Sequence, residues 1–185
     1  MKGFVRKDSF LSLCGLNCGL CSMHVDGYCP GCGGGEGNQS CKIAKCSLVH
    51  EKVEYCSQCS EFPCEKYEGI DEYDSFITHQ NQMKDLAKAE KIGVEAYSTE
   101  QKEKAEFLKL LLSNYNDGRK KTFFCLAVNL LDIADLRTIM QQIKDVIEMS
   151  DLPLKEKSAK AVKIFQDIAE QRQITLKLKK KSLKK

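Results

Sequence analysis

The sequence lacks tryptophan and has only three prolines and three histidines among its 185 residues. It contains no H-E-x-x-H pair, no P-loop and no nucleophile elbow, so the motifs of several common enzyme classes are missing. No stretch reaches the roughly 18 apolar residues of a membrane-spanning helix. The first ten residues carry charges where a secretory signal needs an apolar run. We therefore expect a cytoplasmic protein, and the sequence favours a non-enzymatic role.

Cysteine is abundant and very unevenly placed. Of the 11 cysteines, all but Cys125 lie between Cys14 and Cys64. Such a cluster indicates either disulfides or metal ligands, and cytoplasmic thiols are kept reduced. The region has little apolar periodicity, so we expect no apolar core of its own and a fold held by metal. Cys125 lies in an apolar run and is expected to be a small core residue.

The candidate metal ligands share short spacings typical of zinc sites. They are Cys14, Cys18, Cys21, Cys29, Cys32, Cys41, Cys46, Cys56, Cys59 and Cys64. A C-x-x-C turn lets two thiolates converge on one ion, and two such turns complete a tetrahedron. Within C-P-G-C-G, proline fixes φ at the start of the turn and Gly33 permits a positive φ after it. The sequence therefore predicts two or more zinc ions in residues 1–68.

The spacing does not fix which cysteines share an ion. We favour a zinc ribbon that joins Cys29 and Cys32 to Cys56 and Cys59. The remaining pairs, Cys18 with Cys21 and Cys41 with Cys46, would then form a second site, with Cys14 and Cys64 nearby. His24 and His50 would raise the ligands to the number for three tetrahedral sites, although a lone loop histidine is more often only solvated.

An iron–sulfur cluster is the competing cofactor. The spacing Cys14-x3-Cys18-x2-Cys21 is the one that radical S-adenosylmethionine enzymes use for a four-iron cluster. Those enzymes need most of a β/α barrel, and no strand–helix alternation follows here. We therefore expect zinc, with another kind of iron–sulfur cluster as the alternative.

Residues 69–176 are predicted to form an all-α bundle of about five helices. Apolar residues recur with helical period from about residue 74, beginning with Phe76. Gly93 is expected to stop the first helix, and Ser98 with Gln101 resembles a capping box that opens the next. Further apolar runs predict helices up to about residue 169. The expected fold is a small cysteine-rich zinc module, similar to a ribbon or knuckle, followed by this bundle.

Charge is concentrated at the C-terminal end of the sequence. The chain has 29 Lys and Arg against 26 Asp and Glu. Six of the lysines lie in residues 177–185, so the rest of the chain is mildly acidic. We expect this basic tail to be a frayed, solvated helix end or a weak contact for nucleic acid or anionic lipid. A broad nucleic-acid surface is not indicated.

A second basic group follows a predicted turn at residues 116–118. Arg119, Lys120 and Lys121 open an apolar helix, where the helix dipole disfavours cations. The three side chains either point into solvent or help free backbone amides to bind an anion. They are therefore a candidate anion site.

The cysteine segments resemble a prokaryotic family of domains of unknown function. The segments are C-G-L-N-C-G-L-C (14–21), C-P-G-C (29–32), C-K-I-A-K-C (41–46) and C-S-Q-C-S-E-F-P-C (56–64). They are similar to the family pattern over residues 12–68, and 114–121 resembles longer members. One departure is Ala44, where the family pattern suggests arginine. The resemblance implies zinc binding and no reaction.

Together these features predict a structural zinc module that binds a protein or an anionic ligand. All-thiolate zinc sites are usually closed, which leaves no position for a substrate. The alternative is a redox-active or iron–sulfur protein. In the redox case, Cys14 or Cys64 would react, because both lie outside the favoured sites.

Overall fold

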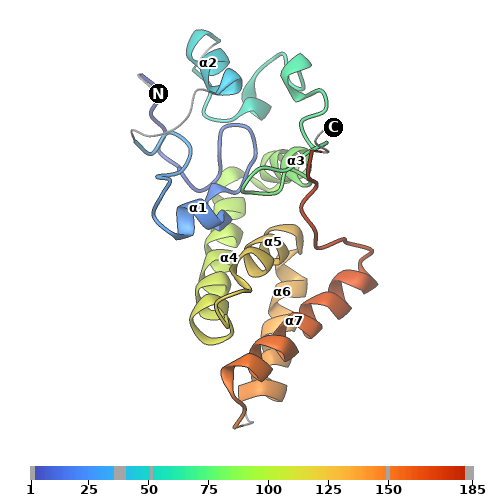
Figure 1. Ribbon diagram of the computed structural model, residues 1–185. Helices are drawn as coiled ribbons and strands as arrows, with labels where there is room; N and C mark the ends of the chain where they lie inside the picture. The colour runs from blue at the N-terminus through green and yellow to red at the C-terminus, as the bar shows by residue number, and fades with distance from the viewer. Residues whose placement is uncertain (1–2, 36–40, 51, 149–150, 182–185) are drawn as a thin grey trace. The chain divides into compact units, whose positions relative to one another are not determined.

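The computed structural model describes residues 3–35, 41–50, 52–148 and 151–181, and these are mostly helical (Figure 1). Within these ranges there is no sheet, and one isolated antiparallel bridge joins Leu11 to Asn17. The prediction of a mostly helical chain is confirmed. The predicted basic tail at residues 177–185 falls partly outside the described residues, from residue 182 onward.

The described residues form two compact units. The first contains residues up to Gln101 together with those from Leu178 onward, and the second runs from Lys102 to Lys177. Helix α4 (Val94–Asn114) contributes residues to both. The boundary predicted at residue 68 lies within the first unit and remains a prediction, because compactness alone does not define a domain.

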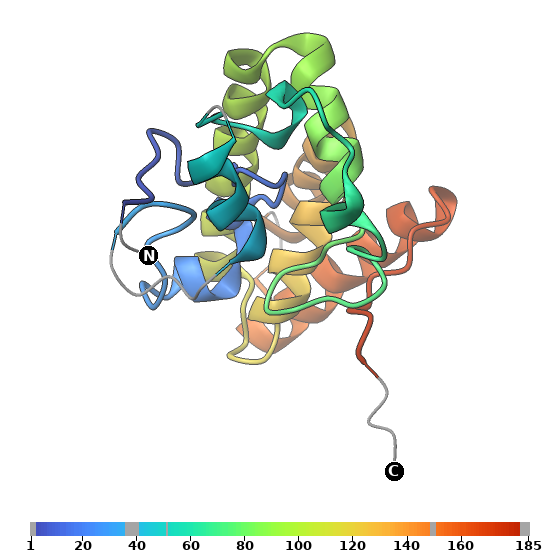
Figure 2. The ribbon, with the colours of Figure 1, turned by 90° about the horizontal axis from the view of Figure 1, so that it is seen from above.

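The first unit begins with short elements joined by loops, as Figure 2 shows around α2. These elements are the 3₁₀-helices η1 (Cys18–Leu20), η2 (Cys56–Gln58) and η3 (Glu65–Tyr67), and the α-helices α1 (Ser22–Val25) and α2 (Lys42–Val49). Helix α3 (Gln82–Ile92) and the start of α4 follow. The prediction of little regular structure in the cysteine-rich region is confirmed.

The expectation that the cysteine-rich loops lack an apolar core is wrong. Their isolated apolar side chains pack against α3 and the start of α4, and the buried members are Leu11, Tyr55, Tyr67, Leu86, Ala89 and Tyr97. A second small core joins Phe4, Leu13 and Ala44. The sequence does not predict these cores, because the residues that pack together are widely separated along the chain and follow no helical period.

Helix α3 begins later than predicted. Phe76 is 69% exposed and lies before the helix, so its assignment to the buried face is wrong. The preceding residues form a loop around Asp74, whose Oδ1 accepts hydrogen bonds from the Thr78 hydroxyl and the His79 amide. The predicted stop at Gly93 is confirmed, with φ at +88°, a value that favours glycine.

The predicted capping box at Ser98 is also wrong. Helix α4 starts at Val94, so Ser98 lies inside it. The Ser98 hydroxyl donates instead to Asp8 Oδ2 at 3.0 Å, and the Tyr55 hydroxyl donates to the same oxygen at 3.2 Å. A serine that bonds a distant carboxylate has the same local sequence as a cap, which explains the error.

The C-terminal segment returns to the first unit in an irregular conformation. The Lys179 amide donates to Asp74 Oδ2 at 2.7 Å, and the Asp74 amide donates to the Lys179 carbonyl at 2.8 Å. The Lys179 ammonium group donates to the Asp71 carbonyl at 3.1 Å. Residues 177–181 are therefore not the frayed helix end that the sequence suggested.

We expect Asp74→Ala to detach residues 178–181 without unfolding the helices. The substitution removes a charged acceptor of the Lys179 amide, a bond worth about 1.5–3 kcal/mol when well formed. Hydrogen exchange should show a faster Lys179 amide. Asp71→Ala is the matched control, because Asp71 contacts this segment through its backbone carbonyl. Equal exchange at Lys179 in both variants would contradict the assignment.

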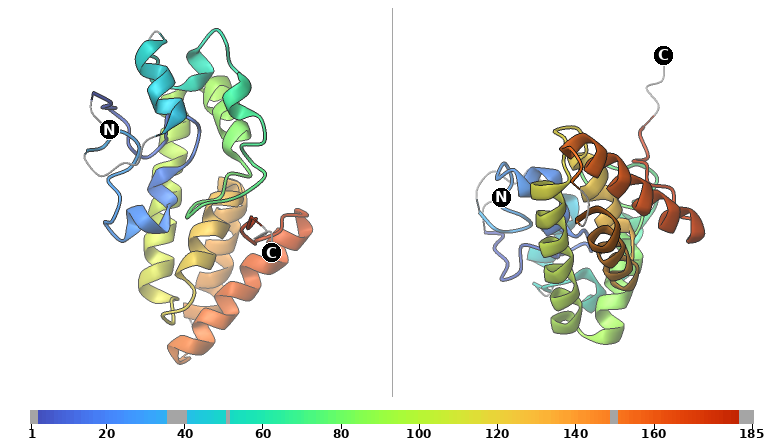
Figure 3. Two further views of the ribbon diagram at one scale, coloured as in Figure 1. Left: turned by 45° about the horizontal axis from the view of Figure 1, so that its top comes forward. Right: turned by 90° about the horizontal axis from the view of Figure 1, so that it is seen from below.

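The second unit is built from the rest of α4, α5 (Lys121–Leu130), α6 (Ile133–Ile143), the π-helical turn η4 (Lys144–Glu148) and α7 (Leu154–Gln171). Figure 3 shows α6 and α7 side by side. The rings of Phe124 and Phe165 are both fully buried and meet edge to face at 5.8 Å. Cys125 is buried, as predicted. Among the described residues, no helix is long and apolar enough to span a membrane.

Candidate metal centres

Two of the C-x-x-C segments form the same local turn. The Cys21 amide donates to the Cys18 carbonyl at 3.0 Å, and the Cys59 amide donates to the Cys56 carbonyl at 3.0 Å. Each segment is thus one 3₁₀ turn, which brings its two cysteines close together. Burial raises the pKa of Cys21, and two backbone amides that donate to its sulfur act against this rise. Such N–H···S bonds stabilise a thiolate and favour metal ligation.

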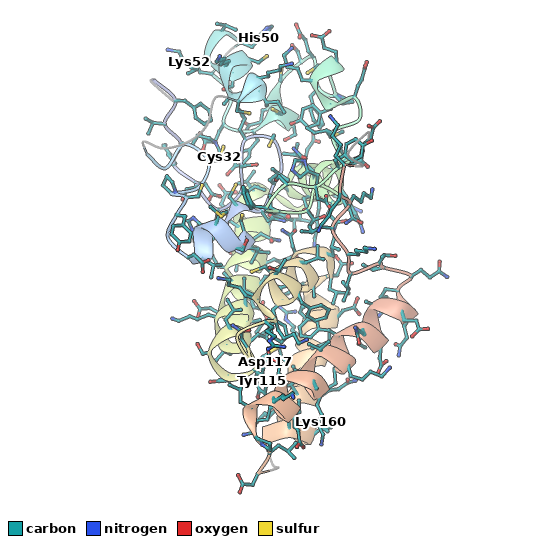
Figure 4. The ribbon with its side chains drawn as sticks, viewed as in Figure 1. Cys32, His50, Lys52, Tyr115, Asp117 and Lys160 are labelled. Atoms are coloured by element: carbon teal, nitrogen blue, oxygen red, sulfur yellow. The ribbon has the colours of Figure 1, made fainter. Side chains whose placement is uncertain are left out.

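Five cysteines line a cavity of about 190 Å³, here called the first cavity. They are Cys14, Cys18, Cys29, Cys32 and Cys41. Apolar side chains, including Phe4, Leu13 and Ile43, supply most of the remaining wall. Figure 4 shows Cys32 among the loops that precede α2. Cys21 is absent from this lining, but its amide donates to the carbonyl of Cys18, which does line the cavity.

The other four cysteines of the cluster line a smaller cavity of about 30 Å³, here called the second cavity. They are Cys46, Cys56, Cys59 and Cys64. His50, labelled in Figure 4 near the end of α2, also lines this cavity. Its Nδ1 lies 3.9 Å from the Glu61 carboxylate. This set contains the four sulfurs that a closed tetrahedral zinc site requires.

Helix α2 contributes residues to both cavities, and the cavity linings group the cysteines differently from the pairing favoured by sequence. Cys41 precedes α2 and lines the first cavity, whereas Cys46 lies within α2 and lines the second. Cys41 has an extended backbone, with φ −114° and ψ 128°. The pair Cys41 and Cys46 is therefore split between the two linings and does not act as one C-x-x-C turn would.

Burial opposes ionisation of the thiols when no cation is present. It raises the pKa of Cys14 to about 11 and that of Cys56 to about 12. The pKa of Cys18 is raised further, first by burial and then by neighbouring cysteines. A divalent cation would reverse this balance by replacing the protons, so the donor chemistry fits a metal.

The thiols would have to move inward to hold an ion. Within residues 3–35, 41–50, 52–148 and 151–181, no three His, Cys, Asp or Glu side chains are grouped closely enough to hold a metal. Zinc–sulfur bonds measure about 2.3 Å, so ligation would contract each cavity around its ion.

Arg6 is a buried residue that bonds to Cys32, one of the cysteines of the first cavity, and sequence reasoning missed it. Its side chain is 2% exposed, and its guanidinium donates to the carbonyls of Asp8, Leu11 and Glu54 at 2.7–3.2 Å. The guanidinium also lies 4.9 Å from the centre of the Tyr55 ring. Burial raises the pKa of Cys32, and the charge and hydrogen bond of Arg6 oppose that rise.

The sequence gives no signal for Arg6, because the apolar residues Phe4 and Val5 are adjacent and do not show which of residues 4–6 face inward. Phe4 and Arg6 are buried while Val5 between them is 83% exposed, which is the alternation of an extended segment. Gly33 allows this packing, because a Cβ there would lie 2.8 Å from Arg6 Cγ. The glycine that follows the C-P-G-C turn thus makes room for the arginine.

Tyr67 connects the two groups of cysteines. Its hydroxyl bonds to the Cys56 sulfur and donates to the Cys14 carbonyl at 3.4 Å. Gln82 Nε2 at the start of α3 donates to the same carbonyl at 2.9 Å. Residues that follow the cysteine segments therefore support the ligand positions from outside, as supporting groups around metal sites do.

The two histidines differ in their surroundings. His24 Nδ1 lies 2.9 Å from the Cys29 carbonyl, and its ring packs edge to face against Phe10. His24 itself lines neither cavity, although its partner Cys29 lines the first, whereas His50 lines the second cavity. As metal ligands, both remain predictions.

Three amides just before α5, at the candidate anion site, already have acceptors. Asn116 Oδ1 accepts from the amides of Gly118 and Lys120, and Asp117 Oδ1 accepts from the Arg119 amide at 3.0 Å. Figure 4 shows Asp117 in the loop between α4 and α5. The amides of Gly118, Arg119 and Lys120 are thus engaged, and the anion site at Arg119, Lys120 and Lys121 stays a prediction.

The chemistry of the two cavities is inferred from the residues that line them. Comparison of this chain with protein-family models, curated proteins and solved structures finds no match.

Proposed function

We propose that this chain is a zinc-binding protein whose second cavity is a closed, structural four-thiolate site. The observation that carries the proposal is the gathering of Cys46, Cys56, Cys59 and Cys64 around a cavity of about 30 Å³. These cysteines come from α2, from the η2 turn and from the loop after it. Four thiolates satisfy zinc without leaving a position for a substrate.

A structural role suits the position of this site. The residues around it pack into the apolar core that contains Tyr55, Tyr67 and Leu86. An ion that joins α2 to η2 would fix the loops that a small apolar core leaves weakly held. We infer that the fixed surface serves binding to a protein or an anionic ligand rather than catalysis.

Zinc analysis of purified variants tests the proposal. Cys59→Ser removes a ligand of the second cavity and should lower the bound zinc by about one ion per chain. Cys125→Ser is the matched control, because it removes a buried cysteine that lies in α5. An unchanged zinc content in Cys59→Ser, measured by native mass spectrometry of folded protein, would reject the site.

An iron–sulfur cluster in the first cavity is the second candidate. The size of that cavity favours it, since about 190 Å³ exceeds the needs of a single ion. Protein purified without air would then be brown and absorb strongly in the visible range. A redox role for Cys14 has less support, because its raised pKa leaves little of the reactive thiolate at neutral pH.

A further inference from the structure

The ten clustered cysteines divide unequally between the two cavities. Four line the second cavity. The other six form one group, since five line the first cavity and Cys21 closes the 3₁₀ turn that begins at Cys18, one of these five. A single tetrahedral ion takes four ligands, so it would leave two thiols of this group unused.

Two divalent ions can use all six sulfurs. When two thiolates bridge the ions and each ion also binds two terminal thiolates, both ions are four-coordinate. The size of the first cavity suits this arrangement, since its volume of about 190 Å³ is several times the 30 Å³ of the second. Its lining residues include no Asp or Glu that would compete as an oxygen ligand.

The charge around the first cavity also suits two ions. Six thiolates and two divalent ions carry a net charge of −2, which is costly to bury without a cation nearby. Arg6 supplies part of the compensating charge, because its buried guanidinium bonds to Cys32 while it also forms an ion pair with Glu54 Oε1 at 3.3 Å. The Leu13 amide donates to the same sulfur. Donors that already point at a sulfur stabilise the thiolate form.

We propose that the first cavity holds a two-ion zinc–thiolate centre, with Cys14, Cys18, Cys21, Cys29, Cys32 and Cys41 as its ligands. Two of these thiolates bridge the ions, and each of the six loses its proton to solvent when the metal binds. The proposal deepens the proposed function and rests on it. Together with the second cavity, the chain then binds three zinc ions through ten thiolates.

Cadmium substitution tests the centre directly. Zinc is replaced by the NMR-active isotope of cadmium in the full chain, and the cadmium spectrum is recorded. Two ions that share a thiolate show scalar coupling through the sulfur, whereas an isolated ion does not. We expect two mutually coupled resonances from the first cavity and one uncoupled resonance from the second.

Variants assign these resonances. Cys32→Ser should remove or shift the coupled pair and keep the uncoupled resonance, and Cys59→Ser should do the opposite. Cys125→Ser should change none of them. If Cys32→Ser does not fold, the wild-type spectrum still decides the question, because coupling is measured there.

These measurements distinguish failure of the two-ion centre from failure of the zinc proposal. Two uncoupled resonances would overturn the two-ion centre and leave the zinc proposal intact. Iron and sulfide in protein purified without air would overturn the two-ion centre in favour of a cluster. A wild-type chain that binds no metal would overturn both proposals.

Discussion

Removal of zinc by a strong chelator is expected to abolish slow amide exchange across residues 14–64. Structural zinc contributes on the order of 10 kcal/mol to a small site. The apolar core within the cysteine-rich loops is small, with Phe4, Leu13 and Ala44 as its buried members. That core cannot replace the metal, because burying one large side chain yields only about 1.5–3 kcal/mol.

Faster amide exchange after removal of zinc should also reach the rest of the first unit and should spare the second unit. Helix α3 packs on Tyr55 and Tyr67, so its amides should also exchange faster. The helices α5, α6 and α7 have their own core around Phe124 and Phe165 and should retain protection. Addition of excess zinc should restore the original pattern. Persistent protection of residues 14–64 in chelator would show that metal does not stabilise them.

Arg6→Met is expected to destabilise the first unit by about 3–5 kcal/mol, the usual cost of breaking a buried charged network. The carbonyls of Asp8, Leu11 and Glu54 would lose their donor. Burying such acceptors without partners costs about 1–3 kcal/mol each. Methionine fills a similar volume, so the loss reports the hydrogen bonds and the charge rather than a cavity.

Urea unfolding of zinc-loaded protein measures the decrease in stability caused by Arg6→Met. Arg137→Met is the matched control, because Arg137 is 59% exposed and pairs with Glu103 on the surface. An exposed pair contributes about 0.2–1 kcal/mol. Arg6→Lys should fall between the two, since an ammonium group keeps the charge but has fewer donors. A loss below 1 kcal/mol for Arg6→Met would contradict the role assigned to Arg6.

Local features of the fold could be read from the sequence. The helical character of the chain, the stop at Gly93 and the burial of Cys125 follow from residues within a few positions of each other. The C-P-G-C-G turn is another case, with Gly33 at φ +76° as the motif requires. Such features depend on dihedral preferences and periodicity, which a single sequence contains.

Contacts between distant residues could not be read in the same way. The division of the cysteines depends on how α2 packs, because Cys41 just before it and Cys46 within it line different cavities. Arg6 meets Glu54 across 48 positions, and Asn17 meets Asp85 across 68. Period and composition assign a residue to a face, but they do not select its partner on another segment.

The bond between Asp74 and Lys179 also sets an order of events during synthesis. These residues lie 105 positions apart, and a ribosome adds about 5–20 residues per second. Several seconds therefore pass between the appearance of the loop and that of its partner. Helices with local contacts form in far less than a second. The nascent chain thus completes its helices while the loop around Asp74 still faces solvent, and the first unit acquires its final segment last.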